Sequence, residues 1–176
     1  MSVKMSRAWA MPNKNTFDIK PIGEIIERYR PSGMLTSVDP FANKNRIADI
    51  CNDIDPQYGC QSQMDALDFL KSLRTDMCDF LLFDPPYSPR QVSEVYKKMD
   101  MTVNMQTTQS SFWGDLKKEV ARVVISGGTV MSFGWNSGGI GKTLGFEIEE
   151  ILLVAHGGWH NDTIVTVETK TKDLFS

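Results

Sequence analysis

The chain has 176 residues, of which 41% are hydrophobic and 23% charged, and its formal net charge at pH 7 is −3. This length and balance predict a single domain over residues 1–176 with its own hydrophobic core, and they exclude a disordered chain. The charge excludes the overall basic excess of many nucleic-acid-binding proteins, so such binding would need a local basic patch. No apolar run reaches the ~20 residues of a membrane span and no signal peptide is predicted, so we expect a cytoplasmic protein without membrane contact.

The candidate metal ligands do not form a recognisable site. Cys51, Cys60 and Cys78 lack metal-binding spacing and are expected to be free thiols, although spacing alone would also permit a Cys51–Cys60 pair. The stretch 156–162 holds two histidines and an acid, which are too few ligands for a metal site and suit the turn of a hairpin. We therefore predict no metal.

The amino-terminal half alternates helix and strand patterns. Residues 1–18 are mixed in character and predict an extended arm or loop. A helix is predicted over 19–29, because Pro21 stands in its first turn and isoleucines recur at helical spacing behind it. The next predicted elements are a strand over 34–38, a strand over 47–50 and a helix over 64–73.

The carboxy-terminal half continues this alternation and ends in two strand-like runs. The predicted elements are a strand over 78–83, helices over 91–99 and 116–123, a turn at Gly127-Gly128, a strand over 129–133, a glycine-rich loop over 134–141, and strands over 145–154 and 163–168. Alternating strands and helices indicate a three-layer α/β domain. The last two runs predict a hairpin that places an antiparallel strand in a mostly parallel, Rossmann-like sheet.

One predicted strand runs directly into the tetrad Asp84-Pro85-Pro86-Tyr87. Proline cannot continue a central strand, so the chain must turn there and leave a carboxylate, a carbonyl and an aromatic ring at the carboxyl end of the strand. In open α/β sheets, ligands bind at this end. A lone tetrad of this kind is a turn in most proteins. This one resembles the catalytic motif of the S-adenosylmethionine-dependent DNA adenine (amino) methyltransferases. Asp39, Asp53 and Asp65 precede it in the order in which that family places its acids.

The resemblance extends to four earlier segments and implies S-adenosylmethionine as the cofactor. Asp53 resembles the family's acid that accepts hydrogen bonds from the ribose hydroxyls, although Asp53 and Asp55 would also suit a plain turn before Pro56. Asp65 would face the amino group of the cofactor's adenine, and Ala66 would leave room for its ring. The other implied cofactor residues are Lys20 and Pro21 near the methionine end, Asp39, Pro40 and Phe41 in the cofactor loop, and Ile54.

The implied chemistry follows from the target amine of adenine, whose lone pair is delocalised into the ring. Acceptors around its two hydrogens would draw the nitrogen towards a pyramidal form and stabilise the positive charge that develops as the methyl group arrives. The Asp84 carboxylate and the Pro85 carbonyl are the candidate acceptors. Tyr87 would stack on a base flipped out of a duplex or taken from a single strand. In the family an initial Asp goes mainly with adenine and an initial Ser with cytosine, so adenine is favoured.

Fewer residues are candidates for contact with the target base and its nucleic acid. Residues 88–113 are the only substantial insert and are expected to form a substrate-side flap, in which Arg90 would touch phosphates or bases. A plain surface loop fits the same composition. Trp135 resembles a residue of the later strand that walls the target pocket, and a place in the core would suit it equally. No segment is long enough for a separate target-recognition domain.

Two departures from the family affect the cofactor side. Asn43-Lys44-Asn45 stands where the family has Gly-Ser-Gly, so no glycine remains to let the backbone approach the cofactor closely. The interval between Asp39 and Asp53 leaves no room for the helix that normally links the first two strands. Loss of this helix would uncover apolar surface. The amino-terminal arm or a second subunit would cover it, and the second case predicts a homodimer.

These observations favour an S-adenosylmethionine-dependent methyltransferase that acts on the exocyclic amine of adenine in DNA. Two alternatives remain open from the sequence. The missing glycines also suit a catalytically degenerate methyltransferase fold that serves as a binding or regulatory subunit, and the same residues would serve an RNA adenine methyltransferase.

Overall fold

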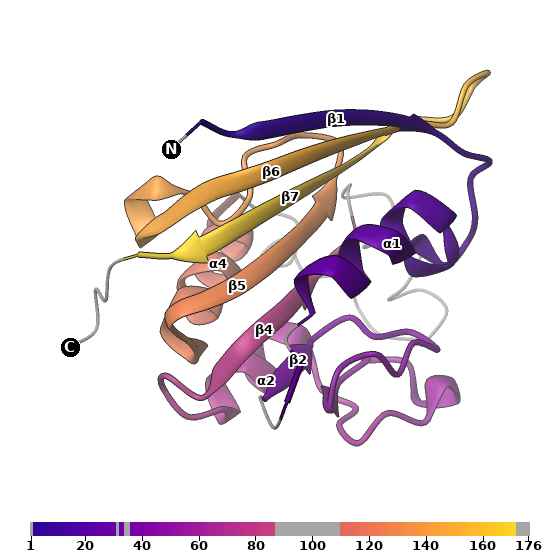
Figure 1. Cartoon of the computed structure of the whole chain (residues 1–176). Coiled ribbons are helices and arrows are strands. Elements are labelled where there is room, and N and C mark those ends of the chain that lie inside the picture. Colours follow the sequence, from indigo (N-terminus) through magenta and orange to yellow (C-terminus); the bar gives the residue numbers. More distant parts are fainter. Residues whose placement is uncertain (1, 31, 34–35, 87–109, 172–176) are drawn as a thin grey trace.

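The computed structural model describes residues 2–30, 32–33, 36–86 and 110–171. Its centre is a seven-stranded sheet in the order β1-β6-β7-β5-β4-β2-β3 (Figure 1). Neighbouring strands are parallel except in the two pairs made by β7, which runs antiparallel to β5 and β6. The strands are β1 (Lys4–Trp9), β2 (Ser37–Asp39), β3 (Ile50–Cys51), β4 (Cys78–Phe83), β5 (Val124–Gly134), β6 (Phe146–Ala155) and β7 (Thr163–Lys170).

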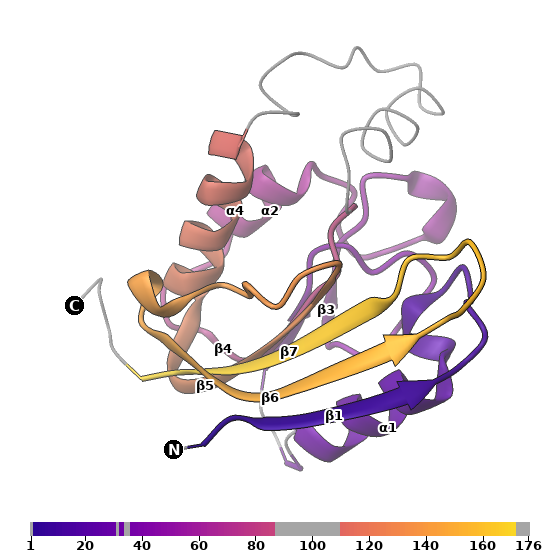
Figure 2. The same cartoon turned by 90° about the horizontal axis from the view of Figure 1, so that it is seen from above.

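Helices cover both faces of this sheet. Helix α1 (Lys20–Tyr29) lies on one face, and α2 (Ala66–Ser72) and α4 (Ser110–Val123) lie on the other (Figure 2). Residues 40–49, between β2 and β3, form turns without a helix. The structure therefore confirms the predicted three-layer α/β fold, its antiparallel strand near the carboxyl end, and the missing helix between the first two strands of the predicted core.

Two packed clusters meet on the central strand β4. Phe80 and Leu82 pack with α1, whose Ile22, Ile25 and Ile26 are buried at helical spacing. The alternate residues Leu81 and Phe83 pack with α2 and α4 on the opposite face. Because successive side chains of a strand point to opposite faces, β4 belongs to both cores at once. Its position in the sheet is therefore set from both sides.

The amino-terminal segment differs from its prediction. The sequence indicates an arm or loop over residues 1–18, whereas Lys4–Trp9 form β1, which pairs parallel with β6 from Lys4↔Glu150 to Trp9↔Ala155. A short 3-10 turn, η1 (Thr16–Asp18), then leads into α1. An edge strand with nearly all its side chains exposed carries no alternating apolar pattern, so the sequence could not reveal it.

The start of β5 also differs, because the glycines predicted to form a turn lie within the strand. Gly127 has a φ of 82°, and the register between β4 and β5 shifts near Cys78 and Phe80. At Gly128, an added Cβ would lie 2.7 Å from a side-chain carbon of Val124 and 3.2 Å from the carbonyl oxygen of Cys78. The pair therefore forms a bulge that lets β5 begin at Val124 and pass close to β4.

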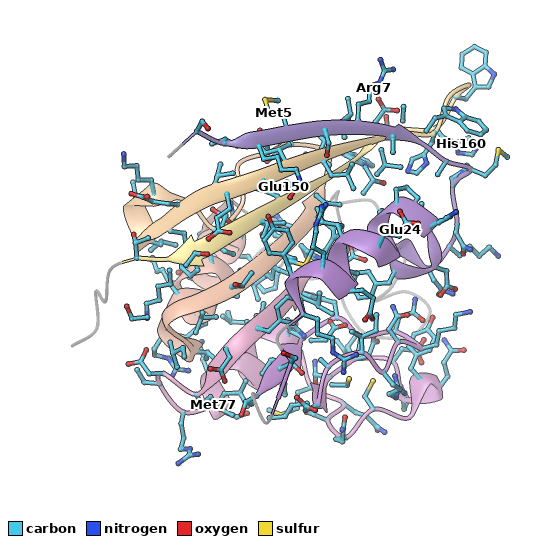
Figure 3. All side chains as sticks on the ribbon, viewed as in Figure 1. Met5, Arg7, Glu24, Met77, Glu150 and His160 are labelled. Carbon is cyan, nitrogen blue, oxygen red and sulfur yellow. The ribbon has the colours of Figure 1, made fainter. Side chains whose placement is uncertain are left out.

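A buried carboxylate joins β1, β6 and α1. Glu150 on β6, which is labelled in Figure 3, is almost completely buried. It accepts hydrogen bonds from Lys4 Nζ at 3.2 Å, Arg28 Nη2 at 2.8 Å and the Tyr29 hydroxyl at 2.8 Å. Burial, together with the hydrogen bond to Glu150, raises the pKa of Tyr29 to about 12. A buried charge needs such partners to offset its lost hydration. Glu150 therefore ties the edge strand to the helix below it.

Two further features bear on earlier expectations. The three cysteines, Cys51, Cys60 and Cys78, are buried free thiols, as predicted. Among the described residues, no helix is long and apolar enough to cross a membrane.

We expect Glu150→Ala to lower the free energy of unfolding by about 2–4 kcal/mol, because it removes the shared acceptor of three charge-assisted or phenolic hydrogen bonds. Urea denaturation would measure the change. Glu147→Ala, which removes an exposed carboxylate from the same strand, is the matched control and should change stability by no more than about 0.5 kcal/mol. Equal effects of the two substitutions would contradict the structural role of Glu150.

Candidate active site

A cavity of about 660 Å³ opens at the carboxyl ends of β2, β3 and β4. This volume lies within the roughly 300–1,000 Å³ typical of pockets for small molecules and cofactors. Parallel strands bring their carboxyl ends to one edge of the sheet, so residues that are distant in sequence converge there. The predicted site residues that line the cavity are Pro40, Phe41, Asp53, Ile54, Asp65, Ala66, Asp84, Pro85, Pro86 and Trp135.

The end of β4 supplies one wall of the cavity. Asp84 follows the last strand residue directly, and the two prolines prevent the strand from continuing. Asp84 is half-buried and Pro85 is buried. Phe83 packs against the ring of Phe41 in an edge-on arrangement, with centroids 5.8 Å apart. This contact joins the ends of β4 and β2. Tyr87 and Arg90 lie outside the described residues, and so does most of the predicted flap over 88–113.

Asp39 lies at the end of β2, directly before the lining residues Pro40 and Phe41, and is completely buried. The Phe41 N–H donates to Asp39 Oδ1 at 3.0 Å, whereas Oδ2 has no hydrogen-bond partner among the described residues. Burial raises the pKa of Asp39 well above its ordinary value, and the carboxylates of Asp84 and Asp53 raise it further against the lowering effect of the Phe41 N–H. An acid in these surroundings favours the neutral form or a cationic neighbour.

The loop Asn43-Lys44-Asn45 closes on itself. Asn43 has a φ of 52°, in the left-handed region that Asn tolerates better than most residues. Its N–H donates to Asp53 Oδ2 at 2.8 Å, and its side-chain oxygen accepts from the Lys44 N–H at 2.7 Å. The Ala42 N–H donates to the Asn52 carbonyl at 2.9 Å. Asn43 thus provides the turn without a glycine, but the backbone N–H groups of this loop are bonded within the protein.

Asp53 and Asp65, the two acids predicted to bind the cofactor, also accept hydrogen bonds from backbone N–H groups. Asp53 accepts from the N–H groups of Asn43 and Asp55 through separate oxygens, and burial raises its pKa. Asp65 caps α2 by accepting from the Leu67 N–H at 2.9 Å. A carboxylate has about four acceptor positions, so the two bonds of Asp53 leave capacity for a ligand. The acids are consequently held in fixed positions at the cavity wall.

Asn52 is a structural residue of this wall that the sequence interpretation missed. It is completely buried, donates from Nδ2 to the carbonyls of Pro40 at 3.1 Å and Met64 at 3.0 Å, and accepts from the Met64 N–H at 3.0 Å. It therefore links the segments that carry Phe41, Asp53 and Asp65. Its place directly before Asp53 was the available signal, because a polar residue at the buried end of a strand needs specific partners.

The structure does not bring Lys20 and Pro21 to the cavity wall. They begin α1, one residue beyond the lining Ile19, and the Lys20 side chain is exposed near Glu24. The preceding segment Pro12–Thr16 lines the cavity instead. No pattern in the sequence indicated this, because the segment reaches the cavity only through the pairing of β1 with β6.

Trp135 lines the cavity from the loop after β5, and a second buried carboxylate holds this loop. Glu168 on β7 accepts from the N–H of Ile140 at 2.6 Å and of Gly141 at 3.0 Å, and burial raises its pKa. Gly139 has a φ of 50°, and an added Cβ there would overlap the Glu168 carboxylate. The loop that carries Trp135 is thus anchored to β7. Among the described residues, no group of three His, Cys, Asp or Glu side chains is arranged to hold a metal ion.

Comparison with known proteins finds similarity in fold. No protein-family model matches the sequence, and no curated protein matches it significantly. TrmN from Thermus thermophilus has a TM-score of 0.59 at 13% identity, covering 86% of this chain and 49% of TrmN. The N-methyltransferase NodS from Bradyrhizobium japonicum WM9 has a TM-score of 0.57 at 10% identity, covering 92% of this chain and 100% of NodS.

A third similar structure includes ligands. The 1,6-didemethyltoxoflavin-N1-methyltransferase of Burkholderia thailandensis, solved with 1,6-didemethyltoxoflavin and S-adenosylhomocysteine, has a TM-score of 0.56 at 11% identity, covering 87% of this chain and 78% of the enzyme. At such identities the similarity shows the fold, which is the Rossmann-like fold of methyltransferases. The chain spans about half the length of TrmN.

Because the carboxyl group of Asp39 is buried, we expect the stability of the protein to depend on pH. The pKa of Asp39 is raised above its ordinary value of 3.8, so the folded protein binds this proton more tightly than the unfolded chain does. Its contribution to stability is full below the unfolded pKa and is lost as pH rises through the folded pKa. Asp39→Asn should therefore raise the free energy of unfolding at pH 8, by about 1–3 kcal/mol, with a smaller gain at pH 5.

Urea denaturation at both pH values would measure this difference. Asp68→Asn, on the exposed side of α2, is the control and should give no comparable pH-dependent gain. An Asp39→Asn variant that is less stable than the wild type at pH 8 would contradict the assignment.

Proposed function

We propose that this protein transfers a methyl group from S-adenosylmethionine to the exocyclic amine of adenine in DNA. The observation that carries the proposal is the position of Asp84-Pro85-Pro86 at the end of the central strand, in a cavity that Asp53, Asp65 and Ala66 also line. The fold supports methyl transfer in general.

The cavity suits the proposed cofactor in volume and in chemistry. Asp53 would accept hydrogen bonds from the ribose diol, and Asp65 would accept one from the adenine amino group. Phe41, Ile54 and Ala66 provide apolar surface for the flat ring. Asp39, with a buried carboxylate oxygen that has no hydrogen-bond partner among the described residues, would favour the positively charged methionine end behind Pro40. When bound, S-adenosylmethionine supplies an electrophilic methyl group on its sulfonium sulfur.

The residues at the end of β4 would activate the acceptor amine. The Asp84 carboxylate and the Pro85 carbonyl would each accept a hydrogen bond from the amine, drawing its lone pair out of conjugation with the ring. They would also stabilise the positive charge that develops on the nitrogen. Asp84 is a suitable acceptor for the proton that the product amine must lose. Because Asp84 and Asp39 are close enough to interact electrostatically, the cavity favours developing positive charge.

The target base would enter beside aromatic side chains. Phe112, Trp113 and Trp135 line the same cavity, and rings of this kind provide stacking surfaces for an unpaired base. Tyr87 remains the predicted stacking residue of the tetrad, and Arg90 the predicted phosphate or base contact. The initial Asp of the tetrad favours adenine over cytosine by the family resemblance.

We expect Asp84→Ala and Asp84→Asn to lower kcat for methyl transfer to adenine-containing DNA by about 10²–10³-fold, because each removes the charged acceptor at the amine. Transfer from labelled cofactor would be the measurement. Asp68→Ala, an exposed acid on α2, is the control and should retain full activity. Full activity of a folded Asp84→Asn variant would rule out the proposed role.

A second candidate function is a non-catalytic binding or regulatory subunit with a degenerate methyltransferase fold. The observation in its favour is the closed cofactor loop, in which the N–H groups of Ala42, Asn43 and Lys44 already donate within the protein. Such a loop offers fewer donors to a bound cofactor than an open glycine loop does.

Cofactor binding distinguishes the two functions. If the protein is an enzyme, S-adenosylhomocysteine should raise its melting temperature by several degrees at 100-fold excess over Kd, since that excess adds ~2.7 kcal/mol to the stability of the folded state. Asp53→Asn should weaken this shift, whereas Asp68→Asn should not. No shift at millimolar ligand, with an intact fold, would favour the binding subunit. Parallel assays with DNA and RNA of one sequence would identify the nucleic acid.

A further inference from the structure

All four tryptophans of the chain lie in or beside the proposed active site. Trp113 and Trp135 line the cavity. Trp9 ends β1 with 66% of its surface exposed, and Trp159 is fully exposed in the β6–β7 connection. A single exposed apolar side chain is common, whereas several gathered at one edge of a protein mark a candidate interaction site. We refer to Trp9 and Trp159 together as the indole pair.

The segments that carry the indole pair continue directly into the cavity wall. Trp159 precedes His160 and Asn161, which line the cavity, and Trp9 lies three residues before the lining Pro12. Strands β1 and β6 are parallel and end together, with Trp9 opposite Ala155. Their carboxyl ends therefore lie at the same edge of the sheet as Asp84. The indole pair is therefore carried by segments at the edge of the sheet where the cavity opens.

Hydrogen bonds hold these segments together. His156 is buried; its Nδ1 lies 2.8 Å from the Ala10 carbonyl oxygen and its Nε2 lies 2.8 Å from Thr163 Oγ1. A carbonyl only accepts, so Nδ1 carries a proton and donates to Ala10. An added Cβ at Gly157 would lie 3.3 Å from Trp9 Nε1, which shows how closely the indole approaches this loop. Trp9 thus lies against the connection that carries Trp159, and His156 joins this connection to the end of β1.

The charges around the cavity differ between its two ends. The β2–β4 end carries Asp53, Asp55, Asp65 and Asp84, whereas the amino-terminal segment carries Lys14. Arg7 projects from β1 on the side away from Glu150 (Figure 3). Asp162 is the acid closest in sequence to the indole pair, and its Oδ1 accepts from the His156 N–H at 3.2 Å. Phosphates would therefore be favoured near Lys14 and Arg7.

We propose that the indole pair is a stacking platform for single-stranded nucleic acid, on which bases flanking the target adenine rest while their phosphates pass near Lys14. This proposal rests on the proposed function and specifies its substrate as an unpaired strand. Exposed indoles stack on unpaired bases of any sequence, whereas the bases of a duplex are already stacked on one another. The limited positive charge fits a platform that depends more on stacking than on phosphate contacts.

Fluorescence anisotropy with labelled oligonucleotides of about twelve nucleotides, each with one central adenine, tests the proposal. The full-length protein should bind single-stranded DNA or RNA more tightly than the matching duplex. Trp159→Ala and Trp9→Ala should each weaken single-strand binding about tenfold, and Trp159→Phe should recover most of the loss. Met5→Ala is the matched control, because Met5 lies on β1 and is 75% exposed at its other end; it should bind as the wild type does.

The outcomes distinguish a platform for single-stranded nucleic acid from an interface between two copies of the chain. Unchanged single-strand binding in both tryptophan variants, or tighter binding of the duplex, would overturn the platform. A dimer measured by light scattering that becomes monomeric on Trp159→Ala would assign the surface to a second copy of the chain instead. The thermal shift with S-adenosylhomocysteine should be equal in all variants. If methyl transfer is absent but the tryptophan variants lose binding, the proposed function fails and the platform stands.

Discussion

The packing of β4 into two cores is the constraint on which the site depends. Phe80 and Leu82 face α1, and Leu81 and Phe83 face α2 and α4. A shift of this strand by one residue would exchange the two sets of side chains, so its register is strongly determined. Asp84 leaves the sheet where this buried strand ends. The position of the proposed catalytic carboxylate is therefore set by apolar packing.

The opposite wall of the cavity depends on the edge of the sheet. Strand β1 is held to β6 by backbone pairing and by the Lys4–Glu150 ion pair, and Glu150 also accepts from Arg28 and Tyr29 on α1. This arrangement directs the chain from β1 past the end of the sheet and into α1. Residues Pro12–Thr16 consequently line the cavity. The amino-terminal segment is thus part of the proposed site as well as of the sheet.

The cofactor side shows how a turn can form without the expected glycines. Asn43 adopts the left-handed conformation, and Asp53 and Asn52 bind the loop through its backbone. The result is a compact loop in place of a helix between β2 and β3. Its internal hydrogen bonds stabilise the wall but use donors that would otherwise face a ligand. The same contacts therefore support the cavity's shape and motivate the test of cofactor binding.

Local patterns in the sequence were sufficient to predict two kinds of element. These are elements whose buried residues recur at a regular spacing and elements that end at residues with a restricted backbone. The isoleucine spacing of α1, the apolar run of β4 and the prolines after it predicted those elements and the place of Asp84. The interval between Asp39 and Asp53 predicted the missing helix. Each of these signals acts over a few residues, through side-chain periodicity or backbone restriction.

Tertiary structure alone decided the features that depend on distant partners. Strand β1 forms because β6 offers an edge to pair with. Asn52 is important because its side chain links three segments. Lys20 does not line the cavity, because it is the first residue of α1 and follows the last lining residue of this segment, Ile19. Trp113 and Trp135 likewise line one cavity because the fold brings α4 and the end of β5 together. Hydrogen bonds and packing between remote segments leave no local pattern. The sequence therefore predicted individual residues of the candidate site, and the fold decided which segments form its walls.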